Sequence, residues 1–231
     1  MLTACLLSAY FIGSAKAQEK QPRTVSVQFG CIVFAEDHRS LAIPSAQGKW
    51  QEVMLSVRYS SKPVKASLVD NELLLYSPSQ LPSPENPAEP LARVKIPTSG
   101  NQFYILLLPS AKDQPAYQAI AISMKGFSYG GICLLNTQRN PIAIVLGGKP
   151  KGIIKPLKPL ILAPKIPDKG LITNVQFYQP KSKKPFYSSN WYLRRDIREV
   201  HIIYLDPRTK RSKIKTIVDV KPPPASLPGK S

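Results

Sequence analysis

Hydrophobic and polar positions alternate with a period of two along most of this chain. The first clear example runs from Val25 to Val33, where every second residue is apolar, which is the spacing of a half-buried β-strand. Similar segments predict further strands at residues 53–59, 66–69, 73–76, 92–96, 103–108, 117–124, 131–136, 142–146, 172–178, 185–192, 200–206 and 214–220. No window of helical length carries an apolar stripe with a 3.6-residue period. We therefore expect an all-β protein with no helix outside an N-terminal leader.

Turn and loop signals separate these segments. Asp70-Asn71-Glu72 predicts a hairpin-like turn, and residues 36–49 are expected to form a loop. The five prolines of residues 77–90 predict a surface loop, because proline cannot donate a backbone hydrogen bond inside a sheet. The proline- and lysine-containing run at 150–167 is expected to be an extended edge segment. Many short strands separated by turns indicate a sandwich or barrel, and we expect small, antiparallel, immunoglobulin-like β-sandwiches.

A weak internal repeat suggests two such domains. Residues 103–109 form an apolar segment that leads through a polar loop into the alternating residues 117–122, and residues 200–207 lead in the same way into 214–218. Any β-hairpin could produce this pattern. With a boundary near Lys125, the expected organisation is a leader at 1–17, sandwiches at 18–125 and 126–220, and a proline-rich disordered tail at 221–231.

The leader is predicted from an uncharged apolar run at residues 2–13, which is too short to span a bilayer as a helix. Ala15-Lys16-Ala17 follows it and has the small-x-small pattern that signal peptidase cleaves. The alternative is a buried first strand. A signal peptide at residues 1–17 predicts an exported protein, located in the periplasm, the outer envelope or the extracellular space.

Cleavage after Ala17 would leave two cysteines, Cys31 and Cys133. In an oxidising compartment they could form a disulfide, and closing a loop of about 100 residues would stabilise the fold by roughly 4–5 kcal/mol. The alternative is that both are small buried hydrophobic residues within strands. The sequence leaves both interpretations open.

Several short motifs lie in the second half of the chain. They are Phe-Ser-Tyr-Gly-Gly at 127–131, Leu-Leu-Asn at 134–136, Leu-Gly-Gly-Lys at 146–149, Ser-Asn-Trp-Tyr at 189–192, Arg198, and Asp-Pro at 206–207. In this arrangement, residues 127–219 resemble uncharacterised secreted proteins of Verrucomicrobia-type bacteria. The resemblance implies export and a β-sandwich architecture, and it implies no activity and no catalytic residue.

The charge of the chain is uneven. The whole sequence has a formal net charge of +18, and residues 149–231 contain 19 Lys and Arg against 5 Asp and Glu, whereas residues 18–148 contain 12 against 9. Such an excess favours contact with polyanions but says nothing about the fold. The cations cluster at Lys149, Lys151, Lys155 and Lys158, at Lys181, Lys183 and Lys184, and at residues 208–215.

The candidate polyanion-binding residues fall into two groups. The expected hairpin after Asp206 carries Arg208, Lys210, Arg211, Lys213 and Lys215, and the segment before it carries Arg194, Arg195 and Arg198 beside Trp191 and Tyr192. Guanidinium groups can bind phosphate or sulfate while neighbouring aromatic rings stack on a sugar or base. The alternative is that these cations only keep exposed strands soluble and prevent edge-to-edge aggregation.

Residues suited to catalysis are few. His38 and His201 have no metal-ligand spacing, there is no Gly-x-Ser-x-Gly motif, and Gly147-Gly148-Lys149 lacks the ending of a phosphate-binding loop. We expect no catalytic residue, metal or cofactor. The predicted function is therefore a non-catalytic binding or structural component of the cell envelope.

This component would use its basic C-terminal domain to contact an anionic envelope polymer or membrane surface, and specific nucleic-acid binding is not expected. Two alternatives stay open. A protein–protein assembly module would show an unpaired strand edge or a large apolar patch. An enzyme acting on an envelope polymer would show a cleft that joins His38 or His201 to a carboxylate.

Overall fold

The structure is a computed structural model that describes residues 22–35, 38–45, 47–110, 115–206 and 208–223. These residues form β-strands and no helix, which confirms the all-β, sandwich-type fold. No helix long and apolar enough to cross a membrane occurs in the described part of the chain. The predicted signal peptide at 1–17 and residues 224–231 of the predicted tail lie outside the described residues.

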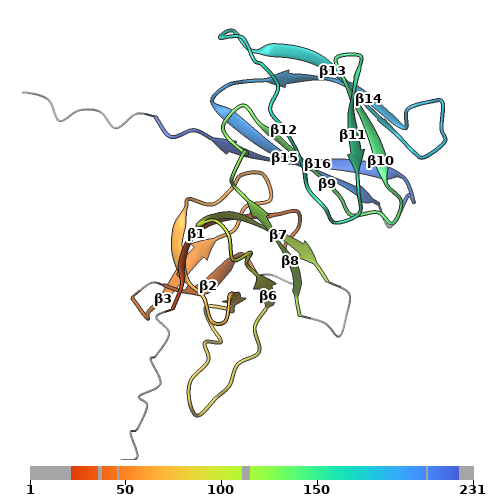
Figure 1. The fold of residues 1–231 in the computed structure, drawn as a ribbon. Helices are drawn as coiled ribbons and strands as arrows, with labels where there is room; N and C mark the ends of the chain where they lie inside the picture. Colours follow the sequence, from red (N-terminus) through yellow and green to blue (C-terminus); the bar gives the residue numbers. More distant parts are fainter. Residues whose placement is uncertain (1–21, 36–37, 46, 111–114, 207, 224–231) are drawn as a thin grey trace, which may run out of the picture.

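The strands fall into two sets of eight (Figure 1). The N-terminal half contains β1 (Thr24–Cys31), β2 (Ser40–Pro44), β3 (Trp50–Met54), β4 (Val64–Ser67), β5 (Glu72–Leu75), β6 (Ala92–Lys95), β7 (Gln102–Pro109) and β8 (Tyr117–Ser123). The C-terminal half contains β9 (Ile132–Asn136), β10 (Ile142–Leu146), β11 (Lys149–Ile154), β12 (Leu160–Leu162), β13 (Leu171–Tyr178), β14 (Tyr187–Leu193), β15 (Ile197–Leu205) and β16 (Ser212–Val220). The boundary expected near Lys125 lies between β8 and β9.

Both halves have the same strand order. One sheet of the N-terminal half has the order β4-β1-β7-β8, and its counterpart in the C-terminal half has the order β12-β9-β15-β16. The opposite layer of the C-terminal half is β11-β10-β13-β14, and in the N-terminal half the hairpins β2-β3 and β5-β6 meet at a bridge between Ala42 and Tyr76. The same pair of residue types, Ala143 and Tyr178, joins β10 to β13. The segments with similar sequence patterns are β7–β8 and β15–β16, which occupy corresponding positions.

Two strand pairings correct the expectation of a purely antiparallel fold. β1 pairs with β7 in parallel, and β9 pairs with β15 in parallel. Parallel neighbours need a long connection between them, and here the connection is the group of strands that builds the rest of the sandwich. Local sequence patterns do not contain this information, because it depends on where the chain returns after five intervening strands.

One local expectation needs correction and another is confirmed. Residues 36–49 were expected to form a loop but contain β2, a five-residue strand that ends at Pro44. Asp70 and Asn71 do form a tight turn, since both have positive φ angles of 49° and 61°. Val69 and Glu72 close this turn with two reciprocal backbone hydrogen bonds, as predicted, and beyond this bridge the strands separate: β4 joins β1 and β5 joins β6.

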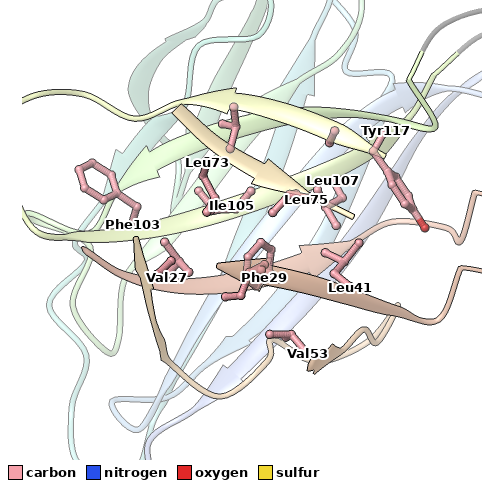
Figure 2. Packing of buried hydrophobic residues seen from close by; sticks show 14 of the residues in the cluster. Val27, Phe29, Leu41, Val53, Leu73, Leu75, Phe103, Ile105, Leu107 and Tyr117 are labelled. Atoms are coloured by element: carbon pink, nitrogen blue, oxygen red, sulfur yellow. The ribbon is translucent and has the colours of Figure 1, made fainter. Parts of the chain in front are cut away.

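The N-terminal core lies between its two layers (Figure 2). Phe103, Ile105 and Leu107 of β7 point into it, where they meet Phe29 of β1 and Leu75 of β5. The C-terminal half has its own core of buried residues. These include Ile144, Val175, Phe177, Leu193 and Ile203.

The two halves share a third buried cluster at their junction, between the lower and upper parts of Figure 1. Tyr104 and Leu106 reach it from the outward face of β7, and Val200 and Ile202 reach it from β15. Gly30 belongs to the same contact, since a Cβ atom there would overlap the Tyr104 hydroxyl group. β7 is therefore buried on both faces, which explains its continuous apolar sequence.

The two cysteines do not form the disulfide that the sequence left open. Both are buried free thiols. Cys31 points into the N-terminal core, whereas Cys133 belongs to the junction cluster, so the sheet that contains β1 lies between them. Burial raises the pKa of Cys31 to about 11 and that of Cys133 to about 12, which keeps both thiols protonated and unreactive.

Candidate functional site

Four loops of the C-terminal half meet at one end of its sandwich. They connect β9 to β10, β11 to β12, β13 to β14 and β15 to β16. The strand registers place them together: Ile142 at the start of β10 pairs with Ile154 at the end of β11, Tyr178 at the end of β13 pairs with Ala143, and Ile203 near the end of β15 pairs with Asn136.

Buried Asn136 holds two of these loops, β9–β10 and β11–β12, against each other. Its side-chain amide donates hydrogen bonds to the carbonyl groups of Asn140, at 2.7 Å, and Ile154, at 3.2 Å. Its side-chain oxygen accepts from the backbone N–H of Gln138, and its backbone carbonyl accepts from Leu157. Because this fully buried residue satisfies groups of the β9–β10 loop and of the end of β11 with the loop after it, it fixes these two connections relative to each other.

The shared end of the sandwich is strongly cationic. We call the exposed Lys and Arg residues of the four loops the basic end: Arg139, Lys155, Lys158, Lys181, Lys183, Lys184, Arg208, Lys210 and Arg211. No ion pair joins any of them to an acidic residue that the structure describes. The excess of positive charge at this end is therefore open to solvent.

The acidic residues of the C-terminal half are already engaged. Each of the five forms an ion pair: Asp168 with Arg195, Asp196 with Arg194, Glu199 with His201 when the imidazole is protonated, Asp206 with Lys213, and Asp219 with Arg198. None of these partners belongs to the basic end. A polyanion would thus meet cations there without competing against an internal carboxylate.

Asp206 shapes the hairpin that presents Arg208, Lys210 and Arg211. Its carboxylate accepts backbone hydrogen bonds from Arg208, at 2.8 Å, and Thr209, at 3.2 Å, and it pairs with Lys213. The Lys213 ammonium and these N–H groups lower the pKa of Asp206 to about 2. Lys213, a predicted ligand-binding residue, therefore stabilises the hairpin instead.

Lysine occupies strained backbone positions in two of the loops. Lys181 and Lys210 have φ angles of 63° and 55°, in the left-handed region that favours Gly or Asn. A left-handed conformation costs an L-residue roughly 1–2 kcal/mol. Such strain often marks a functional segment, because another side chain would form the turn at lower cost.

Two of the predicted arginines, Arg194 and Arg195, do not join the basic end. Arg194 and Arg195 lie in the turn after β14, at the opposite end of the sandwich, and pair with Asp196 and Asp168. Arg195 also lines an open hollow of about 520 Å³ together with residues 128–131. Neither guanidinium group is as available as the cations of the basic end.

Arg198 is a structural residue of the junction. Its guanidinium group donates to Asp219 at 2.7 Å, to the side chain of Gln28 at 2.6 Å and to the carbonyl of Phe127 at 3.1 Å. It also lies over the ring of Tyr129, 4.5 Å from the centroid. Because Gln28 belongs to β1, Arg198 connects the two halves and is not available to an external anion.

Trp191 and Tyr192 have opposite environments. Trp191 packs against the C-terminal core and stacks on His201, with ring centroids 3.8 Å apart. Tyr192 faces solvent on the other side of β14, with 57% of its surface exposed. Lys215, the last predicted cation, is half-buried opposite Ile202, which faces the junction.

The histidines do not form an accessible catalytic centre. His201 hydrogen-bonds to Glu199 at 3.1 Å and to the Thr216 hydroxyl at 2.9 Å, an order of groups that resembles a hydrolase triad. However, His201 is only 3% exposed, and the hollow beside Glu199 has a volume of about 10 Å³, too small for a substrate. His38 lies in the N-terminal half, where its carbonyl accepts a hydrogen bond from the Tyr117 hydroxyl.

No cluster of three or more potential metal ligands occurs among the described residues.

The sequence pattern identified the cations of the hairpin but did not place the loops at 155–158 and 181–184 next to it. The available signal was that lysines recur in alternate connections between strands. No protein-family model matches this chain, and a search of curated proteins finds no similar sequence.

Proposed function

We propose that the protein is an exported, non-catalytic binding component of the cell envelope that attaches to an anionic polymer or surface through its basic end. The observation that carries this proposal is the convergence of nine exposed cations from four loops, without an acidic partner among the described residues. Like charges gathered at one end of the sandwich repel one another, and a bound polyanion relieves the repulsion. Displacement of counterions from the polymer adds a favourable and salt-dependent contribution.

The test is retention of residues 18–231 on heparin across a salt gradient. One variant changes Arg208, Lys210 and Arg211 to Ser, and a second changes Lys181, Lys183 and Lys184 to Ser. We expect both to elute at clearly lower salt than the unaltered protein, because each loses charges from the basic end.

The matched control changes Lys49, Lys62 and Lys65 of the N-terminal half to Ser. These residues are exposed and the net charge falls by the same amount. The control should elute close to the unaltered protein. If the elution salt concentration falls equally in all three variants, net charge alone governs retention, and the proposal that the basic end is the binding site is wrong. Vesicles with and without anionic lipid distinguish a membrane surface from a polymer as the target.

Export is part of the proposal and is supported by the leader pattern at residues 1–17. N-terminal sequencing of the protein isolated from cell envelopes should begin at Gln18. A cytoplasmic protein that retains Met1 would contradict export.

A second candidate function is assembly with another protein. β14 lies at the end of its sheet, and its seven residues include no proline and no charge. Exposed edge strands usually carry a proline or a charged residue that prevents another strand from pairing with them, and β14 has neither. Light scattering measures the mass in solution: a stable oligomer that Ser188→Lys dissociates would favour assembly, and a monomer at all concentrations would exclude self-assembly.

A further inference from the structure

The outer face of the sheet β11-β10-β13-β14 has an unusual set of side chains. Val175 and Phe177 of β13 point into the core, so the alternate residues of this strand face outward. β14 shows the same alternation, because Leu193 is buried in the core. The outward residues of the two strands are Ile172, Asn174, Gln176, Tyr178, Ser188, Asn190 and Tyr192. We call this set the amide–tyrosine face.

The amide–tyrosine face carries hydrogen-bonding groups in ordered positions and no charge. Asn174 donates to Asn190 across the strand pair at 3.2 Å, and the Tyr178 hydroxyl donates to Gln176 at 2.8 Å. Both asparagines are exposed, and each retains further donor or acceptor capacity. Uncharged amides beside aromatic rings can pair with hydroxyl groups and stack on rings, which suits sugars better than a simple inorganic anion.

Tyr192 is held in place before any ligand arrives. Its ring lies against Gly170, where a Cβ atom would come within 2.6 Å of the ring, and its hydroxyl donates to the carbonyl of Lys169 at 3.1 Å. Gly170 has a φ angle of 86°, so both its conformation and its lack of a side chain are required. A ring that is exposed yet fixed loses little conformational entropy when it stacks on a ligand.

The corresponding face of the N-terminal half provides an internal comparison. There the outward residues of β5 and β6, the strands that correspond to β13 and β14, include three charged side chains, Glu72, Arg93 and Lys95. Glu72 lies opposite Lys95 in the strand register, as on an ordinary solvated sheet. Of these two corresponding strand pairs, only β13–β14 has an uncharged outward face, and it belongs to the half that carries the basic end.

The amide–tyrosine face is continuous with the basic end. Tyr178 ends β13, and the loop that follows carries Lys181, Lys183 and Lys184. Lys151 lies on β11 at the opposite edge of the same sheet. A polymer of rings bound across the amide–tyrosine face would therefore contact neutral side chains through its rings. It would meet lysines where the face ends.

We propose that the amide–tyrosine face binds the sugar rings of an anionic polysaccharide whose charged groups contact the basic end. This inference rests on the proposed function and specifies its ligand as a glycan. Because the lysines beside the face attract negative charge, they favour an acidic or sulfated polysaccharide over a neutral one.

The test compares two anionic probes, heparin oligosaccharides and inorganic polyphosphate, by calorimetry. Tyr192→Ala, and separately Asn174→Ala with Asn190→Ala, should weaken heparin binding by about tenfold, the effect of losing roughly 1.4 kcal/mol of contact, and should leave polyphosphate binding unchanged. Tyr192→Phe keeps the ring and should retain heparin binding. Met54→Ala, which removes an exposed side chain of β3 in the corresponding layer of the N-terminal half, is the control.

The outcomes separate the two proposals. If face variants that melt like the unaltered protein keep full heparin affinity, or lose affinity for both probes alike, the sugar-binding face is wrong while the basic end stands. If the unaltered protein binds neither probe, both proposals fail.

Discussion

The two halves of this protein share one framework and differ at corresponding loops. In the C-terminal half, the four loops at one end present nine exposed cations. The corresponding loops of the N-terminal half, at residues 32–39, 55–63, 76–91 and 110–116, contain both signs, including Arg39, Arg58, Glu85 and Glu89. The sheets that support these loops have the same strand order. The fold therefore does not require basic loops, and the positive charge is a surface property of the C-terminal half alone.

The largest expected effect tests whether the halves are energetically separate. Phe29→Ala in the N-terminal core and Phe177→Ala in the C-terminal core should each lower the free energy of unfolding by about 3–5 kcal/mol, because both leave a cavity. Trp50 and Trp191 report on one half each, so Trp50→Phe and Trp191→Phe give single-tryptophan proteins. We expect both reporters to show the same denaturant midpoint, since the junction cluster belongs to both halves. Two separate midpoints would show that the halves unfold independently.

The next effect concerns the charged contact between the halves. Arg198→Ala leaves Asp219 largely buried without its cation and should cost about 3 kcal/mol of stability. Arg194→Ala removes a similar pair with Asp196 that is exposed to solvent, and its effect on stability should be much smaller, because water screens exposed ion pairs. Chemical denaturation of the two variants measures the difference. Similar losses would mean that Arg198 does not anchor the junction.

A smaller effect separates stability from binding in the loops that distinguish the halves. Lys210→Gly relieves a left-handed lysine and should stabilise the protein by about 0.5–1 kcal/mol after the entropy cost of glycine. The same change should reduce retention on heparin. Asp70→Gly relieves a similar strain in the N-terminal half and should leave retention unchanged. Loss of both stability and retention in Lys210→Gly would instead point to a structural role for this lysine.

The smallest effect depends on pH. Because the pKa of Asp206 is lowered in the folded protein, to about 2, its ionised form stabilises the hairpin above the ordinary carboxyl pKa. That contribution is lost as the pH falls from about 4 towards 2. Asp206→Asn should therefore melt below the unaltered protein at pH 7, and the gap should shrink below pH 4. A gap that does not depend on pH would show that the charge of Asp206 is unimportant.

Much of the fold could be predicted from local patterns. Alternating residues identified β1, and the apolar run of β7 matched a strand buried on both faces. The short strand β2 was missed because Pro44 and its polar surroundings read as a loop. The parallel pairing of β1 with β7 was also missed, since it is set by long-range topology.

The candidate site was predicted only in part, for the same reason. The hairpin cations are neighbours in sequence and were found together. Arg198 was misjudged because its partner Gln28 lies 170 residues away, and Trp191 because its ring turns inward to stack on His201. The lysine loops joined the site through strand pairing, which local charge counts do not describe.

The junction between the two halves has an approximate twofold character. Each half contributes the corresponding sheet, β4-β1-β7-β8 or β12-β9-β15-β16, so like surfaces face one another as they do in an isologous dimer. Two identical subunits would have to keep every substitution compatible with both copies. Once they are joined in one polypeptide, each copy can change alone. The contact that ties the halves together thus also permits one of them to specialise while the other remains a partner that completes its buried surface.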